Sequence, residues 1–250
     1  MKRYLQIVLN IPLNQSFTYL DLEADDAAGA ESHVGYRADI KFGNRRTTGF
    51  IVDESDDFPA DCGVEESKIR PILRLLDKEP IFTPELIDLA RWVSQFYLCS
   101  VGEAISAMLP GGKRETDAGS FSFTEEAPDT TARALSEEQS AAVEGILSAA
   151  SPSRLHYLYG PTGTGKTEVF LQAAEQLLAK GKGVIYLVPE IGLTKQVIEA
   201  VVARFGQTAA VLHSALTPSQ RLGEWKRILH KEARVVIGAR SAVFAPVPDL

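Results

Sequence analysis

The chain has 250 residues, of which 45% are hydrophobic and 24% are charged, and its formal net charge is −7. These values are ordinary for a soluble globular protein, and the length suffices for one large or two ordinary domains. No apolar run approaches the roughly 20 residues that a membrane span requires, which argues against a membrane protein. Cys62 and Cys99 form no closely spaced pair, which argues against a disulfide framework and a zinc site. Because no signal peptide is recognisable, we expect a cytoplasmic location.

The amino-terminal part alternates short β-rich runs with turn residues, which predicts a small β-barrel or sheet. Two helices are expected to follow it. The first begins with Thr83 as its cap and Pro84 at its first position, and the second spans 102–109. We therefore predict a β-rich domain with two helices over residues 1–110. The predicted strands are 4–9, 17–22, 36–42, 47–52 and 69–76.

Residues 111–134 lose hydrophobic periodicity and are rich in glycine, serine, threonine and acids, so we predict a linker. From residue 135 strands alternate with helices, which indicates a parallel sheet with right-handed crossovers. The predicted fold class is thus α/β, a barrel-like domain followed by a P-loop NTPase (RecA-like) lobe over 135–250. The predicted helices are 137–149, 168–180, 194–205 and 218–231, and the predicted strands are 155–159, 183–188, 209–213 and 234–237.

Residues 160–167 read Gly-Pro-Thr-Gly-Thr-Gly-Lys-Thr, which satisfies the pattern G-x-x-x-x-G-K-[ST] of a phosphate-binding loop. Glycines let backbone N–H groups turn toward phosphate oxygens, Lys166 reaches the terminal phosphates and Thr167 ligates Mg²⁺. We therefore expect ATP and Mg²⁺ as cofactors, with Lys166 and Thr167 as catalytic residues. The predicted nucleotide contacts are Gly160, Pro161, Thr162, Gly163, Thr164, Gly165, Lys166, Thr167 and Glu168.

Two weaker signals lie on either side of this loop. Gln139 is placed on a helix that enters the nucleotide fold, and an amide can both donate and accept, as reading an adenine edge requires. Thr194, Arg240 and Ser241 follow predicted parallel strands, at the edge where such folds bind ligands, and could grip DNA phosphates. Taken alone, Gln139 is more typical of a solvated helix surface, and the other three residues are more typical of ordinary strand-to-helix turns.

Several segments together resemble the first helicase lobe of the PriA family of bacterial replication-restart helicases, which belongs to superfamily two. The residues 17–19, 42–43 and 70–72 resemble that family's domain for capturing a free 3′ DNA end, so the resemblance extends over everything but the linker. The segments that carry the helicase resemblance are 135–139, 160–169, 187–194, 212–214 with Arg221 and Trp225, and 236–246.

The resemblance implies an ATP-dependent DNA helicase that moves 3′ to 5′ in replication restart and primosome assembly at stalled forks. It implies binding of single-stranded and forked DNA with a free 3′ end, and primosome and single-strand-binding proteins as further partners. We expect a monomer without membrane contact. Gln139 would read adenine, and zinc would belong only to a carboxyl-terminal part that this sequence lacks.

The family's 3′-end pocket can be compared residue by residue. Phe17, Tyr19 and Gly43 match, and Phe17 would stack on the last base unless it is simply a core residue. Thr18 stands where an acid is common, and Arg70 stands where lysine occurs. Thr18 retains hydrogen-bonding capacity but lacks charge, so we expect altered discrimination of the end.

The sequence also differs from the usual pattern of the family in whole domains. The linker 111–134 is too short for the winged-helix domain that family members usually carry. The acidic metal and water motif, the second lobe and the cysteine-rich zinc insertion are missing. We therefore expect an amino-terminal portion that binds DNA and nucleotide with little turnover. Two alternatives stay open: a DNA-end binding module with an inert nucleotide fold, and a small-molecule P-loop kinase, because the glycine loop is common to kinases and helicases.

Overall fold

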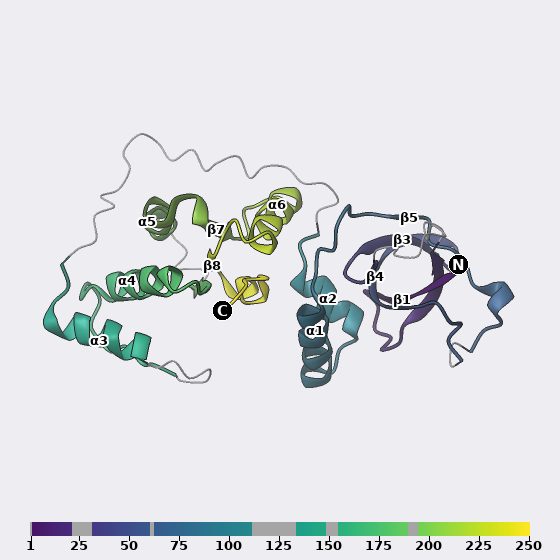
Figure 1. The fold of residues 1–250 in the computed structure, drawn as a ribbon, viewed down its shortest axis with the longest axis horizontal. Coiled ribbons are helices and arrows are strands. Elements are labelled where there is room, and N and C mark those ends of the chain that lie inside the picture. The colour runs from purple at the N-terminus through teal and green to yellow at the C-terminus, as the bar shows by residue number, and fades with distance from the viewer. Residues whose placement is uncertain (1, 22–31, 61–62, 112–133, 149–154, 190–194) are drawn as a thin grey trace. The chain divides into compact units, whose positions relative to one another are not determined.

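The computed structural model describes residues 2–21, 32–60, 63–111, 134–148, 155–189 and 195–250. The chain divides into two compact units, Met1–Glu115 and Thr116–Leu250. The first holds a curled antiparallel sheet with two helices, and the second holds a parallel sheet with helices around it (Figure 1). The predicted fold class is confirmed. Within the described ranges no helix is long and apolar enough to cross a membrane.

The sheet of the first unit curls because its strands bury one face around a common core (Figure 1). Leu5, Ile7, Ile40 and Ile51 are fully buried there. Gly43 takes a φ of 59° in the tight turn between β3 and β4, a conformation that glycine adopts without strain. The strands are β1 (Arg3–Leu9), β2 (Phe17–Asp21), β3 (Arg37–Phe42), β4 (Arg45–Ser55) and β5 (Arg74–Leu75), in the spatial order β2-β1-β4-β3-β5.

The strand predicted at 69–76 is shorter than expected, because only Arg74–Leu75 forms β5. The rest of the segment divides its hydrogen bonds between the two edges of the sheet. Leu20 of β2 exchanges bonds with Arg70 and Ile72, while Leu73 and Leu76 bond to β3. Because the segment bonds to both edges, it forms only the two-residue ladder of β5 with β3, and it closes the sheet into a barrel-like shape.

The first helix of this unit begins where the sequence predicts, and the second begins one residue earlier than predicted; each start carries a capping residue. The Thr83 hydroxyl accepts a hydrogen bond from the backbone N–H of Leu86 before α1 (Pro84–Tyr97). Ser100 and Glu103 form a reciprocal capping box at α2 (Val101–Met108). A Cβ on Gly102 would lie 1.8 Å from the Leu9 carbonyl oxygen, so only glycine lets α2 lie directly on the end of β1.

A buried ion pair fastens β3 to the chain that leaves the sheet. The Arg37 side chain donates to the Asp77 carboxylate through Nε at 3.0 Å and Nη2 at 2.6 Å, and the two side chains are 5% and 3% exposed. The Arg37 backbone N–H adds a third bond to Asp77 at 2.9 Å. Arg37 also donates to the Pro110 carbonyl, so this one side chain joins β3, the segment before α1 and the end of α2.

The second unit is built on three parallel strands in the order β6-β8-β7. Every residue of β7 and β8 is buried, as expected of a sheet covered on both faces. Side chains of α4 and α5 pack on one face and those of α6 on the other. The elements are α3 (Glu137–Ser148), α4 (Lys166–Ala179), β6 (Val184–Leu187), α5 (Lys195–Phe205), β7 (Ala209–Leu212), α6 (Pro218–Leu229) and β8 (Val235–Gly238).

The predicted strand at 155–159 is wrong: the structure has no strand there. Leu155, Tyr157 and Tyr159 are 97%, 86% and 83% exposed. The apolar pattern is that of a strand, but a strand also needs a neighbour, and no described strand pairs with this segment. The loop that follows it is therefore held by helices, through α4, which it leads into, and through a hydrogen bond from Gln139 of α3.

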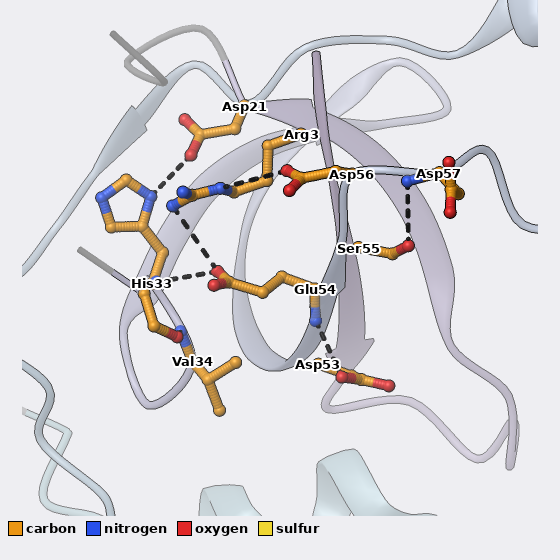
Figure 2. Close-up of polar contacts among 10 residues, drawn as sticks. Arg3, Asp21, His33, Val34, Asp53, Glu54, Ser55, Asp56 and Asp57 are labelled. Carbon is orange, nitrogen blue, oxygen red and sulfur yellow. Dashed lines mark hydrogen bonds and ion pairs between the residues drawn. The ribbon is translucent and has the colours of Figure 1, made fainter. Parts of the chain in front are cut away.

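A polar cluster lies at one end of the curled sheet, where Asp21 of β2 meets His33 (Figure 2). The His33 Nδ1 lies 2.6 Å from the Asp21 carboxylate, and the His33 backbone N–H donates to Glu54 at 2.9 Å. Arg3 lies beside Glu54 and Asp56 at about 4 Å. The hydrogen bond with Asp21 raises the pKa of His33, an effect that burial opposes and the Asp21 and Glu54 charges reinforce.

We predict that Asp77→Ala lowers the free energy of unfolding of the first unit by about 3–5 kcal/mol, because it leaves the Arg37 charge buried without its counter-ion. Native-state hydrogen exchange of the β3 and β4 amides measures this. The matched control is Asp88→Ala, since Asp88 makes an exposed pair with Arg91, for which about 0.5 kcal/mol or less is expected. Equal effects of the two substitutions would contradict a special role for the buried pair.

We also predict a pH-dependent contribution from His33. Since its pKa is raised in the folded state, its stabilisation is complete below the ordinary value of 6.5 and is lost as the pH rises through the folded-state pKa. As the pH rises from 6 to 8, the first unit should therefore lose stability that a His33→Gln variant does not lose. The same exchange experiment at both pH values tests this, and parallel pH profiles for the two proteins would rule it out.

Candidate functional site

A groove of about 1100 Å³ in the first unit collects all five residues predicted to hold a 3′ end. They come from three places: β2, the turn after β3, and the segment that closes the barrel. The curled sheet brings these distant parts of the sequence together. The five residues are Phe17, Thr18, Tyr19, Gly43 and Arg70.

Tyr19 and Arg70 both bond to the hairpin between β3 and β4. The Tyr19 hydroxyl donates to the Lys41 carbonyl at 3.2 Å, and the Arg70 guanidinium donates to the Gly43 carbonyl at 3.3 Å. Burial raises the pKa of Tyr19, so its hydroxyl stays a neutral donor. No atom lies within 4 Å of the place where a Cβ on Gly43 would stand, so this turn is open to a ligand.

Phe17 and Thr18 face opposite ways along β2. The Phe17 ring packs edge-on against Phe42 with centroids 4.9 Å apart and rests on the core, so it is both a core residue and part of the groove. The Thr18 hydroxyl accepts a hydrogen bond from the Gln6 amide at 3.1 Å, and the Gln6 carbonyl in turn accepts one from Ser16 at 2.9 Å. Thr18 therefore belongs to a polar chain across β1 and β2.

The groove also holds charged residues besides the five predicted ones. Both basic and acidic side chains line it, so the groove is mixed in charge and not uniformly basic. These residues come from β3, β4, α1 and the segments around residues 57 and 68, and only the fold brings them together. They are Lys41, Lys68 and Arg91 on the basic side, and Asp53, Glu54 and Asp57 on the acidic side.

In the second unit the loop 160–167 forms a turn that leads into α4, whose first two residues are Lys166 and Thr167. Gly163 and Gly165 take φ values of 88° and 76°, which glycine adopts without strain. Gly165 is the residue before the first turn of α4, and no side chain caps this helix. Backbone N–H groups at an uncapped helix start form a binding site for anions such as phosphate.

We call the backbone N–H groups of Gly165 and of the first turn of α4 the anion cup. The side chain of Lys166, the first residue of α4, turns back onto the loop. Its ammonium donates to the carbonyl oxygens of Gly160 and Pro161 at 2.6 and 2.7 Å, and the Thr164 hydroxyl also donates to Pro161 at 2.9 Å. Thr167, the predicted Mg²⁺ residue, is exposed beside it, and Tyr186 of β6 lies within hydrogen-bonding reach of its hydroxyl. The residue types, the positive φ angles and the cationic side chain fit a nucleotide triphosphate with its metal ion.

Gln139 contacts the loop directly. Its amide donates to the Thr164 carbonyl at 2.9 Å, and its carbonyl accepts from the Ser136 backbone N–H at 2.9 Å. A Cβ at Gly165 would lie 2.7 Å from the Gln139 amide nitrogen, so glycine is needed for this approach. The structure thus places Gln139 against the phosphate loop, and its predicted contact with adenine stays a prediction.

Glu168, the last of the predicted nucleotide contacts, is engaged on the flank of α4. Arg204 of α5 donates to Glu168 at 2.8 Å and to both oxygens of Glu175 at 2.6 and 2.8 Å. The Gln172 amide adds a bond to Glu168 at 2.8 Å. The hydrogen bonds to Glu175 and Glu168 raise the pKa of Arg204, so it stays fully charged.

A second cavity, of about 670 Å³, lies at the carboxyl ends of β7 and β8 and includes Arg240 and Ser241. His213 and Arg221 line it as well. Burial and the Arg221 charge lower the pKa of His213, which favours its neutral form. Thr194, predicted to act with Arg240 and Ser241, lies outside the described residues.

In comparisons with known proteins, each of the two units matches a family model. Residues 6–110 match the family model of the PriA 3′DNA-binding domain (3′BD), and residues 136–247 match that of the DEAD/DEAH box helicases. The chain is 48% identical to the replication restart protein PriA of Treponema pallidum over 250 residues, which is 100% of this chain and 37% of that protein.

Two further relatives carry the same name. The Bacillus subtilis protein is 48% identical over 118 residues, which cover 46% of this chain and 15% of that protein. The Haemophilus influenzae protein is 29% identical over an alignment of 324 residues, which covers 99% of this chain and 43% of that protein. The chain thus spans well under half the length of each of these relatives. Because the last alignment is longer than the chain, that relative carries residues within the aligned region that this chain lacks.

Proposed function

Because the chain belongs to the PriA family, whose amino-terminal part it matches, we propose that it binds DNA with a free 3′ end and ATP with Mg²⁺, as part of an ATP-dependent helicase that moves 3′ to 5′ in replication restart. The observation that carries this proposal is the uncapped start of α4, where two glycines with positive φ and the Lys166 ammonium form an anion cup. The groove around Arg70 supports the DNA-binding half.

In the nucleotide site each residue has a role that follows from its chemistry. Backbone N–H groups at the start of α4 would bind phosphate oxygens, and Lys166 would exchange its bonds to Gly160 and Pro161 for the β- and γ-phosphates. The Thr167 hydroxyl would hold Mg²⁺, which when bound supplies positive charge beside the phosphates. Gln139 would set the position of the loop through Thr164 and read the adenine edge.

In the first unit we propose that the groove holds the last nucleotide of a strand. The Phe17 ring would stack on the base, and Arg70 and the open backbone at Gly43 would meet the backbone of the DNA. Tyr19 would act through its hydroxyl, because its ring is part of the core. Arg240 and Ser241, with Thr194, would bind phosphates of the same or the other strand at the sheet edge of the second unit.

We place the domain boundaries at residues 110 and 135, with 111–134 as the linker, because the two matched family models end and begin near these positions. The alignment with the Treponema pallidum relative has the same length as this chain, so that protein shares the short connection. Recognition of forks is then reduced, or is provided by another part of the protein. Primosome and single-strand-binding proteins are the proposed partners.

The two alternative functions predict different experimental results. A DNA-end binding module with an inert nucleotide fold predicts no nucleotide binding, and a small-molecule kinase predicts nucleotide use that DNA does not change. The match to the helicase family speaks against the kinase. For the chain itself we propose nucleotide binding with little turnover. DNA-stimulated hydrolysis by a longer protein that contains this chain separates all three.

We predict that Lys166→Ala weakens binding of Mg²⁺–ATP by about 10- to 100-fold, because charge-assisted hydrogen bonds to phosphate are lost. Titration with a fluorescent ATP analogue measures the affinity, and binding of single-stranded DNA with a free 3′ end should not change. The matched control is Lys182→Ala, an exposed lysine of the same unit outside the loop. Unchanged nucleotide affinity of Lys166→Ala would refute the nucleotide site.

For the DNA groove we predict that Thr18→Asp raises the preference for a 3′-hydroxyl over a 3′-phosphate end by about tenfold, because a carboxylate accepts from the hydroxyl and repels the phosphate. Arg70→Ala should weaken binding to both ends. Anisotropy titrations with the two oligonucleotides measure both effects, with Lys78→Ala as an exposed control outside the groove. If Thr18→Asp leaves the preference unchanged, the end does not lie in this groove.

A further inference from the structure

The first turn of α4 differs from the first turns of three other helices in this chain. In α2, α3 and α6 the side chain three residues after the cap folds back and accepts a hydrogen bond from the cap residue's own backbone N–H. These contacts are Glu103 with Ser100 at 2.9 Å, Gln139 with Ser136 at 2.9 Å, and Gln220 with Thr217 at 3.0 Å. The fold-back is the usual behaviour of an acid or amide at this position.

Glu168 occupies the same position in α4, three residues after Gly165, yet it does not fold back. The caps also differ in their backbone, because Gly165 has a φ of 76° whereas Ser100 and Thr217 are extended. Its carboxylate accepts from Arg204 and Gln172 on the flank of the helix, both at 2.8 Å. The Arg204 side chain is 6% exposed and the Glu168 side chain 16%, so the contact is largely shielded from water. Glu175, which also lies on α4, accepts hydrogen bonds from the other edge of the Arg204 guanidinium.

This difference has a consequence for ligand binding. The backbone N–H of Gly165 belongs to the anion cup, and a carboxylate that folded back onto it would occupy a donor that a phosphate needs. The positive end of the helix dipole attracts any anion, including one from the protein itself. Glu168 is therefore a built-in competitor for the site, unless another group holds it elsewhere.

We propose that Arg204 is a positioning residue that holds the Glu168 carboxylate on the flank of α4 and so keeps the Gly165 backbone N–H available for phosphate. The inference rests on the proposed nucleotide site, whose affinity it explains. It assigns a role in nucleotide binding to a residue on a different helix, with no contact to the nucleotide. Gln172 assists Arg204, but its neutral amide makes the weaker hydrogen bond.

The test is a set of variants in which removal of the competitor restores binding. Arg204→Gln should weaken binding of a fluorescent ATP analogue with Mg²⁺ by about 5- to 30-fold, the range expected for an anion at a helix start. Adding Glu168→Ala to Arg204→Gln should restore the affinity to within about twofold of the original. Alanine is chosen because a glutamine could itself fold back, as Gln220 does. The matched control is Glu175→Ala, which removes the other partner of Arg204 and should leave the affinity unchanged.

A second measurement needs no nucleotide. In the ligand-free protein, hydrogen exchange at the Gly165 amide should slow in Arg204→Gln, because the carboxylate then covers it, and should return to the original rate in the double variant. If Arg204→Gln and the double variant bind equally weakly and the Gly165 rate never changes, Arg204 only packs α5 on α4 and the inference is wrong. If the original protein binds no nucleotide but the Gly165 rates follow the stated order, the nucleotide assignment fails while the positioning role stands.

Discussion

The backbone N–H groups at the start of α4 have no partners within the helix, and the chemistry proposed for the second unit depends on how they are satisfied. Three helices, α2, α3 and α6, solve the problem internally, by a hydroxyl cap and a side chain that folds back. The helix α4 instead begins at a glycine that offers no side chain. Its N–H groups are left for a ligand, and the neighbouring acid is kept aside by α5. A helix start without a cap is less stable by itself, so packing must supply what capping does not.

That packing comes from the parallel sheet. The side chains of α4 and α5 share one hydrophobic cluster with β7 and β8, so the ion pairs between the two helices form on a surface that is already in place. The loop before α4 has no strand of its own among the described residues, and its contacts are with α3 through Gln139. The nucleotide site is thus supported from the helix side, by α3 and α5.

The groove of the first unit is formed in another way, by the closure of a small sheet. This closure brings together β2, the turn between β3 and β4, and the segment 70–72. Tyr19 and Phe17 serve the core and the groove together, which means that a change at either affects stability as well as binding. The buried pair of Arg37 and Asp77 joins β3 to the segment between β5 and α1. It fixes where that segment leaves the sheet.

The fold class, the helix start at Thr83 and the phosphate loop could be predicted from the sequence alone, because each depends on residues close together in the chain. The sequence also identified the residues that the first unit's groove collects, through their resemblance to a known family. What it could not determine are features that depend on partners far away in the sequence. The apolar run at 155–159 has the composition of a strand, but only pairing makes a strand, and the segment at 69–76 divides its bonds between two edges. Whether Glu168 folds back or stays on the flank was likewise decided by Arg204, 36 residues later, and only the tertiary structure brings that charge within 2.8 Å.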